Sequence, residues 1–154
     1  MMKFFGRWTV VIPTSVLLIA TACSGSGSST SSSGSAAGGR DVAVTLRQWA
    51  VTPTATTVSA GSVTFTVKND GTIPHEFAVL QTETPAGDFP IESFEGETDR
   101  IDEDTAGTNV GETGDLNAGT TKTLTIDLAP GHYAFVCNLP GHYGQGMHTD
   151  FTVT

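Results

Sequence analysis

Cysteine and basic side chains are both scarce in this sequence, and each shortage narrows what the protein can be. The 154 residues contain only two cysteines, Cys23 and Cys137. They lie in very different sequence settings, so a structural disulfide between them is not expected. Lysine and arginine together number 7 against 16 aspartate and glutamate residues, which gives a net charge of -9. This excess of negative charge argues against binding to nucleic acid, whose phosphates would repel the protein, and fits a protein that meets a basic partner.

A long membrane-spanning apolar run is also missing. Residues 10–20 are apolar, but the run is short for a bilayer and Pro13 interrupts it. Lys3 and Arg7 precede the run, and small residues follow it at positions 20–22, which is the arrangement of a secretory signal peptide. We therefore expect residues 1–22 to be a signal peptide that directs export, with an uncleaved anchor as the weaker alternative.

Cys23 directly follows these small residues, so the segment resembles a bacterial lipoprotein signal, in which the cysteine becomes the lipidated first residue. Ala20 departs from that pattern, which usually has leucine there, and ordinary cleavage after Ala22 is the alternative. Residues 23–40 are rich in serine and glycine and would form a flexible tether. We expect the mature protein at the extracytoplasmic face of a membrane, held by a lipid anchor on Cys23, or free in the periplasm or secreted.

The remaining residues, 41–154, read as one all-β domain. Apolar and polar residues alternate with period two, which indicates half-buried strands, and turn signals such as Pro130-Gly131 separate the runs. Many short strands of this kind predict an antiparallel β-sandwich or barrel. The alternating residues are Val42, Val44, Leu46; Val63, Phe65, Val67; Leu124, Ile126, Leu128; and Phe151, Val153.

Residues 83–115 break this pattern because they combine many carboxylates with few β-branched pairs. A stretch this long without regular structure is usually functional or mobile in a compact domain. We expect a long acidic insert here, which is either a solvated excursion or a surface that docks a partner.

A thiol, two imidazoles and a thioether form the most informative group in the domain. Cys137 ends a predicted strand on its core face, a tight loop leads to His142, and glycines allow a second turn that returns Met147. His75 begins another predicted strand, which a β-sandwich can place beside the Cys137 loop. These are the ligands of a blue-copper electron-transfer site. Zinc is the rival metal, but thioethers are not its usual ligands.

Two segments carry a resemblance to a known family. Residues 63–77, VTFTVKNDGTIPHEF, and residues 133–147, YAFVCNLPGHYGQGM, resemble the cupredoxins, especially the plastocyanin/azurin-like and sulfocyanin-like members. The resemblance implies a Greek-key β-sandwich with one type 1 copper ion that carries single electrons. It implies His75, Cys137 and His142 as ligands, with Met147 as the axial ligand. It also implies that the protein is not an enzyme by itself.

The same resemblance implies that electrons pass through His142, with Leu139, Pro140 and Tyr143 forming a docking patch around it. One departure is Glu76, because family members usually have asparagine after the first histidine to tie that strand to the cysteine loop. The hydrogen bonding around the ligands is therefore left open. His148 adjoins Met147, but successive residues of an extended segment point to opposite sides, so both cannot easily face one ion.

The sequence as a whole predicts a monomer that exchanges single electrons with redox proteins, whose docking surfaces we expect to be basic. The alternative function is a copper carrier that delivers the ion to an oxidase. That alternative requires a site that releases copper readily, whereas an electron carrier retains it.

Overall fold

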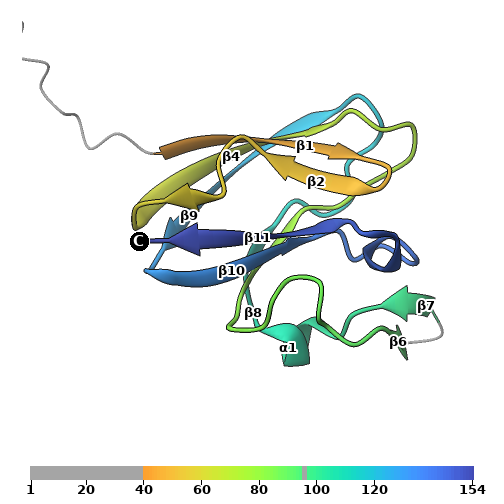
Figure 1. The fold of residues 1–154 in the computed structure, drawn as a ribbon. Coiled ribbons are helices and arrows are strands. Elements are labelled where there is room, and N and C mark those ends of the chain that lie inside the picture. Colours follow the sequence, from red (N-terminus) through yellow and green to blue (C-terminus); the bar gives the residue numbers. More distant parts are fainter. Residues whose placement is uncertain (1–39, 95–96) are drawn as a thin grey trace, which may run out of the picture. The chain divides into compact units, whose positions relative to one another are not determined.

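The computed structural model describes residues 40–94 and 97–154 (Figure 1). The predicted signal peptide and Cys23 lie outside the described residues. The strands are β1 Arg40–Arg47, β2 Ala50–Pro53, β3 Thr57–Val58, β4 Gly61–Asn69, β5 Ala78–Gln81, β6 Glu92–Phe94, β7 Glu97–Arg100, β8 Thr108–Glu112, β9 Thr121–Leu128, β10 Gly131–Val136 and β11 His148–Val153. A one-turn helix, α1, covers Glu103–Ala106, and a 3₁₀ turn, η1, covers Tyr143–Gln145.

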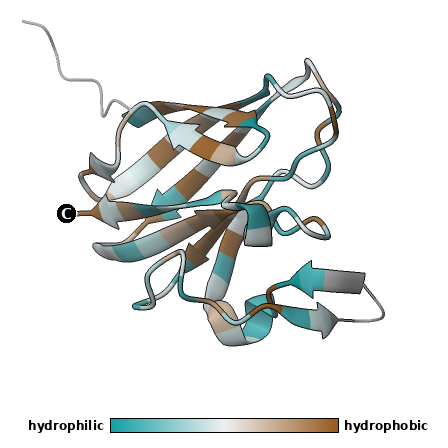
Figure 2. Cartoon of the chain, turned by 45° about the vertical axis from the view of Figure 1, so that its right-hand side comes forward, coloured by the Kyte–Doolittle hydropathy of each residue, from teal (hydrophilic) through white to brown (hydrophobic). Residues whose placement is uncertain are grey.

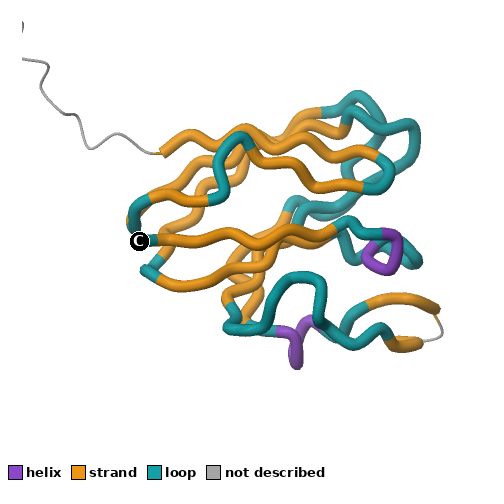
Figure 3. The backbone as a smooth tube through the Cα atoms, in the orientation of Figure 1, coloured by secondary structure: helices purple, strands orange, loops and turns teal. Residues whose placement is uncertain are grey.

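Two sheets face one another as the layers of a sandwich (Figures 1 and 3). One has the order β2-β1-β4-β9 and the other β3-β11-β10-β5-β8, while β6 and β7 pair separately. The predicted β-sandwich is confirmed, but its sheets are mixed rather than wholly antiparallel. β1 pairs with β4, and β3 with β11, in parallel. The reason is that the chain leaves the first sheet after β2, adds β3 to the other sheet, and only then returns as β4.

The core between the sheets is made by the alternating residues that the sequence pattern identified (Figure 2). Phe65 lies at its centre, with ring centroids 5.6 Å from Phe77, 5.4 Å from Phe135 and 5.9 Å from Phe151. Offset and edge-to-face contacts of this kind add to the stabilisation that burial of apolar area provides. Cys137 and Met147 belong to the same buried cluster, so the metal ligands lie at one end of the main core.

Residues 83–115 are not the structureless acidic insert that the sequence suggested. β8 pairs with β5 at the edge of the five-stranded sheet. Other residues of the segment cover the outer face of that sheet, because Phe89 and Ile101 are buried in a second cluster together with Leu80 and Val136. β5 and β10 are therefore buried on both faces, which explains why their sequences, AVLQ and GHYAFV, lack clean alternation.

Within residues 40–94 and 97–154, no helix is both long and apolar enough to cross a membrane.

Candidate metal centre

His75 is held at the edge of the core by a turn that Asn69 organises. The fully buried Asn69 side chain donates to the carbonyls of Ile73, at 2.9 Å, and Leu116, at 2.8 Å, and accepts from the Gly71 amide at 2.8 Å. The backbone of His75 then exchanges two hydrogen bonds with Leu116, of 3.0 and 2.7 Å. This network fixes the backbone that carries the imidazole before β5 begins, so the sequence signal Asn69-Asp70-Gly71 marks more than a simple turn.

Cys137 follows the last residue of β10 and is completely buried. Its Sγ accepts a hydrogen bond of 3.2 Å from the backbone amide of Glu76, the residue after His75. Its own amide donates to the carbonyl of Met147 at 2.9 Å. Cys137 is therefore tied through its sulfur to the residue after His75 and through its amide to Met147. Although Glu76 replaces the usual asparagine, the connection between the two ligand segments is made by its backbone.

His142 lies on the loop between β10 and β11. Its amide donates to the carbonyl of Leu139 at 2.9 Å, and its own carbonyl accepts from the amide of Met147 at 3.3 Å. Gly141 and Gly146 have φ values of 80° and 105°, which glycine adopts without the steric cost other residues meet. These two reversals turn His142 and Met147 back toward Cys137.

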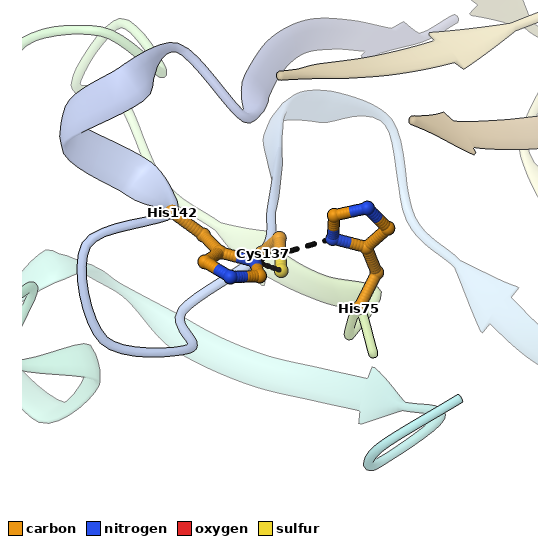
Figure 4. Close-up of side chains that lie close together, drawn as sticks. All are labelled: His75, Cys137 and His142. Carbon is orange, nitrogen blue, oxygen red and sulfur yellow. Dashed lines mark hydrogen bonds between the residues drawn. The ribbon is translucent and has the colours of Figure 1, made fainter. Parts of the chain in front are cut away.

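The three predicted ligands His75, Cys137 and His142 converge (Figure 4). His142 Nδ1 lies 3.2 Å from His75 Nδ1 and 3.3 Å from Cys137 Sγ, and all three donor atoms lie within 4.8 Å of one another. Each residue is buried. Two imidazole nitrogens and one sulfur directed at a common point match the ligand preferences of copper, so the residues present fit that metal.

Met147 is fully buried in the same cluster as Cys137. The carbonyl of Met147 accepts the amide hydrogen of Cys137, which keeps the two residues adjacent. His148 begins β11 and packs on the ring of Tyr143, with centroids 5.0 Å apart. His132 bonds through its two ring nitrogens to the Thr82 carbonyl, at 2.8 Å, and to the Asp150 carboxylate, at 2.9 Å. Neither of these two histidines belongs to the group that converges with Cys137.

Burial sets the protonation of the metal-free site. It raises the pKa of the Cys137 thiol to about 11. It lowers the pKa of His75, with a further contribution from His142, and it lowers the pKa of His142 itself. Charged forms are disfavoured where water is excluded. At neutral pH the site therefore holds two neutral imidazoles, which can bind a metal directly, and a protonated thiol, which must first lose its proton.

We expect uptake of Cu(II) at about pH 8 to release about one proton per ion, because Cys137 can bind the ion only after its thiol has lost its proton. Apparent affinity should therefore strengthen as pH rises toward the thiol pKa of about 11. Calorimetric titration in two buffers of different ionisation enthalpy measures the release. Cys137→Ser provides the control, since it has no thiol proton to lose. Loading of the wild type without proton release would show that the thiol is already ionised.

Asn138 is a site residue that sequence reasoning missed. Its buried side chain accepts from the Ile101 amide at 2.8 Å, donates to the Ile101 carbonyl at 3.0 Å, and donates to Glu103 Oε1 at 2.9 Å. The residue next to Cys137 thus anchors the segment that covers the five-stranded sheet. Tyr143 adds a second anchor, because its hydroxyl donates to the Ala86 carbonyl at 2.8 Å.

The predicted docking patch requires one correction. Tyr143 is buried, and its hydroxyl also accepts a hydrogen bond from the amide of Phe89 at 3.1 Å. Leu139 is half-buried against the main core and Pro140 is exposed. Tyr143 therefore packs the loop onto the covering segment and does not contribute to the surface beside His142.

The family model described as a cupredoxin-like domain matches residues 14–149. No curated protein matches the chain significantly. Reduced auracyanin from the photosynthetic bacterium Roseiflexus castenholzii is a similar solved structure, with 24% identity, a TM-score of 0.52, and coverage of 74% of this chain and 94% of that one.

Two further auracyanins share the fold. Auracyanin B has 22% identity and a TM-score of 0.54 over 75% of this chain and 88% of its own. Auracyanin A, a "blue" copper protein from the green thermophilic photosynthetic bacterium Chloroflexus aurantiacus, has 20% identity and a TM-score of 0.52 over 76% of this chain and all of its own, 100%. At these identities the likeness concerns the fold alone.

Proposed function

The chain belongs to the cupredoxin-like domain family, with His75, Cys137 and His142 as its copper site, and from this premise we propose that it is a carrier of single electrons. The observation that supports the proposal is the buried convergence of one sulfur and two imidazole nitrogens within 4.8 Å. Bound copper supplies one-electron chemistry by cycling between Cu(I) and Cu(II). The protein's part is to hold the three ligands in place in both states and to keep bulk water away.

A rigid ligand frame suits this role. Hydrogen bonds from the Glu76 amide and to the Met147 carbonyl fix Cys137, and burial in a packed core resists movement of the ligands. A redox titration of the copper-loaded chain tests the proposal. We expect an intense visible band that bleaches reversibly on addition of a single electron per copper. A chain that binds copper without such a band would contradict the proposal. Turnover of a substrate by the purified protein would contradict a purely electron-carrying role.

The alternative function, delivery of copper to an oxidase, requires rapid release of the ion. All three convergent ligands are buried, and even His142 is only 9% exposed to solvent. This burial favours retention of copper and supports electron transfer over delivery.

Met147 would complete the proposed ligand set through its thioether sulfur. We expect Met147→Gln to retain copper and to lower the reduction potential, because an oxygen donor favours Cu(II) over Cu(I), while the thioether would contribute little to binding the ion. Protein-film voltammetry measures the potential. His148→Ala is the matched control and should leave the potential unchanged. Loss of copper from Met147→Gln, or a rise in its potential, would argue against this role of Met147.

The surface beside His142 supports docking of a protein partner. Trp49 and Ile91 are exposed, at 41% and 47%, and both lie against the ligand loop. The Trp49 ring stands edge-on to His142 with centroids 5.1 Å apart, and a Cβ on Gly144 would meet Ile91 Cδ1 at 3.2 Å. With exposed Pro140 they form the docking patch of this proposal. Trp49→Ser should slow electron transfer to a partner without changing the visible spectrum, and an unchanged rate would remove Trp49 from the patch.

The proposed occupant of the docking patch is a redox protein with a basic rim, because exposed Asp88 and Glu92 lie on the segment that carries Ile91 and the whole chain has a net charge of -9. Charge complementarity of this kind chiefly raises association rates.

We expect Asp88→Asn/Glu92→Gln to slow association with a basic c-type cytochrome used as a probe. The effect should fade as salt rises, because the screening length falls from about 10 Å at 0.1 M to about 3 Å at 1 M. Stopped-flow electron transfer across ionic strength measures it. The control is Asp41→Asn/Asp127→Asn, which removes equal charge from exposed positions of the four-stranded sheet. Equal slowing in both double variants, or a flat salt dependence, would contradict steering by this segment.

Export and lipid anchoring also belong to the proposal. They rest on the apolar run at residues 10–20, the small residues before Cys23 and the serine- and glycine-rich residues after it. Intact mass of the mature protein tests them. A lipid-modified N-terminal Cys23 would support the anchor, and an unmodified chain beginning at Cys23 would support secretion or a periplasmic location.

A further inference from the structure

His75 carries a buried polar atom that the copper site itself does not use. Its Nδ1 is directed at the other ligands, 3.2 Å from His142 Nδ1. Its Nε2 is buried and has no hydrogen-bond partner among the described residues. When Nδ1 of a histidine binds a metal, Nε2 carries the ring proton. That N–H would be a buried donor, and a buried donor without an acceptor destabilises the structure.

The atoms around Gly71 include hydrogen-bond acceptors close to this nitrogen. A Cβ built on Gly71 would come within 2.7 Å of His75 Nε2, within 2.5 Å of Gln48 Oε1 and within 3.1 Å of Asn69 Oδ1, which already accepts the Gly71 amide hydrogen. Gln48 Oε1 and His75 Nε2 therefore border the same small space beside Gly71. A glycine is required there, because a side chain at this position would collide with both atoms.

Two hydrogen bonds to Thr72 hold the Gln48 side chain near this space. Its Nε2 donates to Thr72 Oγ1 at 2.7 Å, and its Oε1 accepts from the Thr72 amide at 3.1 Å. A carbonyl oxygen accepts two hydrogen bonds, so Oε1 retains one free position. Gln48 also sits at the turn between β1 and β2, next to Trp49, whose ring contacts His142.

We propose that Gln48 is a positioning residue of the copper site, and that its Oε1 accepts the Nε2–H of His75 when copper is bound. The proposal rests on the proposed function. The β1–β2 turn would then support the His75 imidazole from outside, through Gln48. A hydrogen bond of this kind fixes the ring orientation and makes the ligating nitrogen more basic. A more basic His75 Nδ1 stabilises Cu(II) relative to Cu(I), so Gln48 lowers the reduction potential.

Substitutions at Gln48 test this in the copper-loaded full chain. Gln48→Leu should weaken Cu(II) binding by ~10-fold, at the lower end of the range for loss of such a partner, and raise the potential. Gln48→Glu keeps the shape and offers a stronger acceptor, so it should lower the potential below that of the wild type. In the reduced protein, NMR should show a slowly exchanging His75 Nε2–H that becomes fast-exchanging in Gln48→Leu.

Two controls separate this role from general structural support. Thr72→Val removes the Gln48 Nε2 bond but leaves Oε1, so the potential should stay near that of the wild type. Gln145→Leu makes the same chemical change at an exposed position between His142 and Met147 and should leave the reduction potential unchanged. The proposal is overturned if Gln48→Leu keeps the slow Nε2–H, or if the Leu and Glu variants shift the potential in the same direction. A wild-type chain without a visible band would instead refute the proposed function.

Discussion

Substitution of Cys137 by serine is expected to abolish the visible absorption band of the copper-loaded protein. The band arises from charge transfer between a thiolate and copper, and Cys137 is the only cysteine among the described residues. A serine hydroxyl is a hard donor that keeps its proton at neutral pH. The fold should survive, because a hydroxyl at this position can still accept the Glu76 amide hydrogen that Cys137 Sγ accepts at 3.2 Å.

Absorption and EPR spectra of the loaded variant check this result, and circular dichroism checks the fold. Cys23→Ser is the matched control and should keep the full band, since we assign the ligand role to Cys137 alone. Persistence of the band in Cys137→Ser would show that the sulfur ligand has been assigned wrongly.

The second large effect is expected at Asn138. Asn138→Leu leaves the buried Ile101 amide and carbonyl without the partners they have at 2.8 and 3.0 Å. Each unsatisfied buried group costs about 1–3 kcal/mol, so the free energy of unfolding should fall by about 2–6 kcal/mol if the two costs add. Urea denaturation of the metal-free chain measures this loss. Asn117→Leu changes an exposed asparagine and should have little effect.

A paired variant makes the Asn138 test specific. Asn138→Asp keeps the acceptor for the Ile101 amide but loses both donors and places a carboxylate beside Glu103, which Asn138 contacts at 2.9 Å. Adding Glu103→Gln replaces that repulsion with a donor and should recover part of the loss. If the double variant is no more stable than Asn138→Asp, the contact with Glu103 contributes nothing measurable.

The sandwich and the convergent ligands could be predicted from the sequence because both follow from local patterns. Period-two alternation identified Val63, Phe65 and Val67 as core residues, and all three are fully buried. The spacing of Cys137 and His142 identified ligands that the structure brings together. These features depend on side-chain chemistry that a short window of sequence displays.

The residues that support the metal ligands could not be predicted in this way. Gln48 and Asn138 are polar residues in turns, where a single sequence reads them as solvent-exposed. Their partners, Thr72 and Ile101, lie far along the chain or on a segment that reads as acidic and irregular. The segment that covers the outer face of the five-stranded sheet was not predicted either. One signal for it was present, because Ala78, Val79 and Leu80 form an unbroken apolar run, as expected for a strand buried on both faces.

The double-sided burial of β5 and β10 has a consequence for the lifetime of the folded protein. Ligands at the edge of a singly covered sheet can be freed when one surface loop opens. Here His142 and Cys137 border a sheet that is enclosed between the main core and the segment containing Phe89 and Ile101. Local openings that expose β10 must break both sets of contacts, so their free energy should approach that of global unfolding.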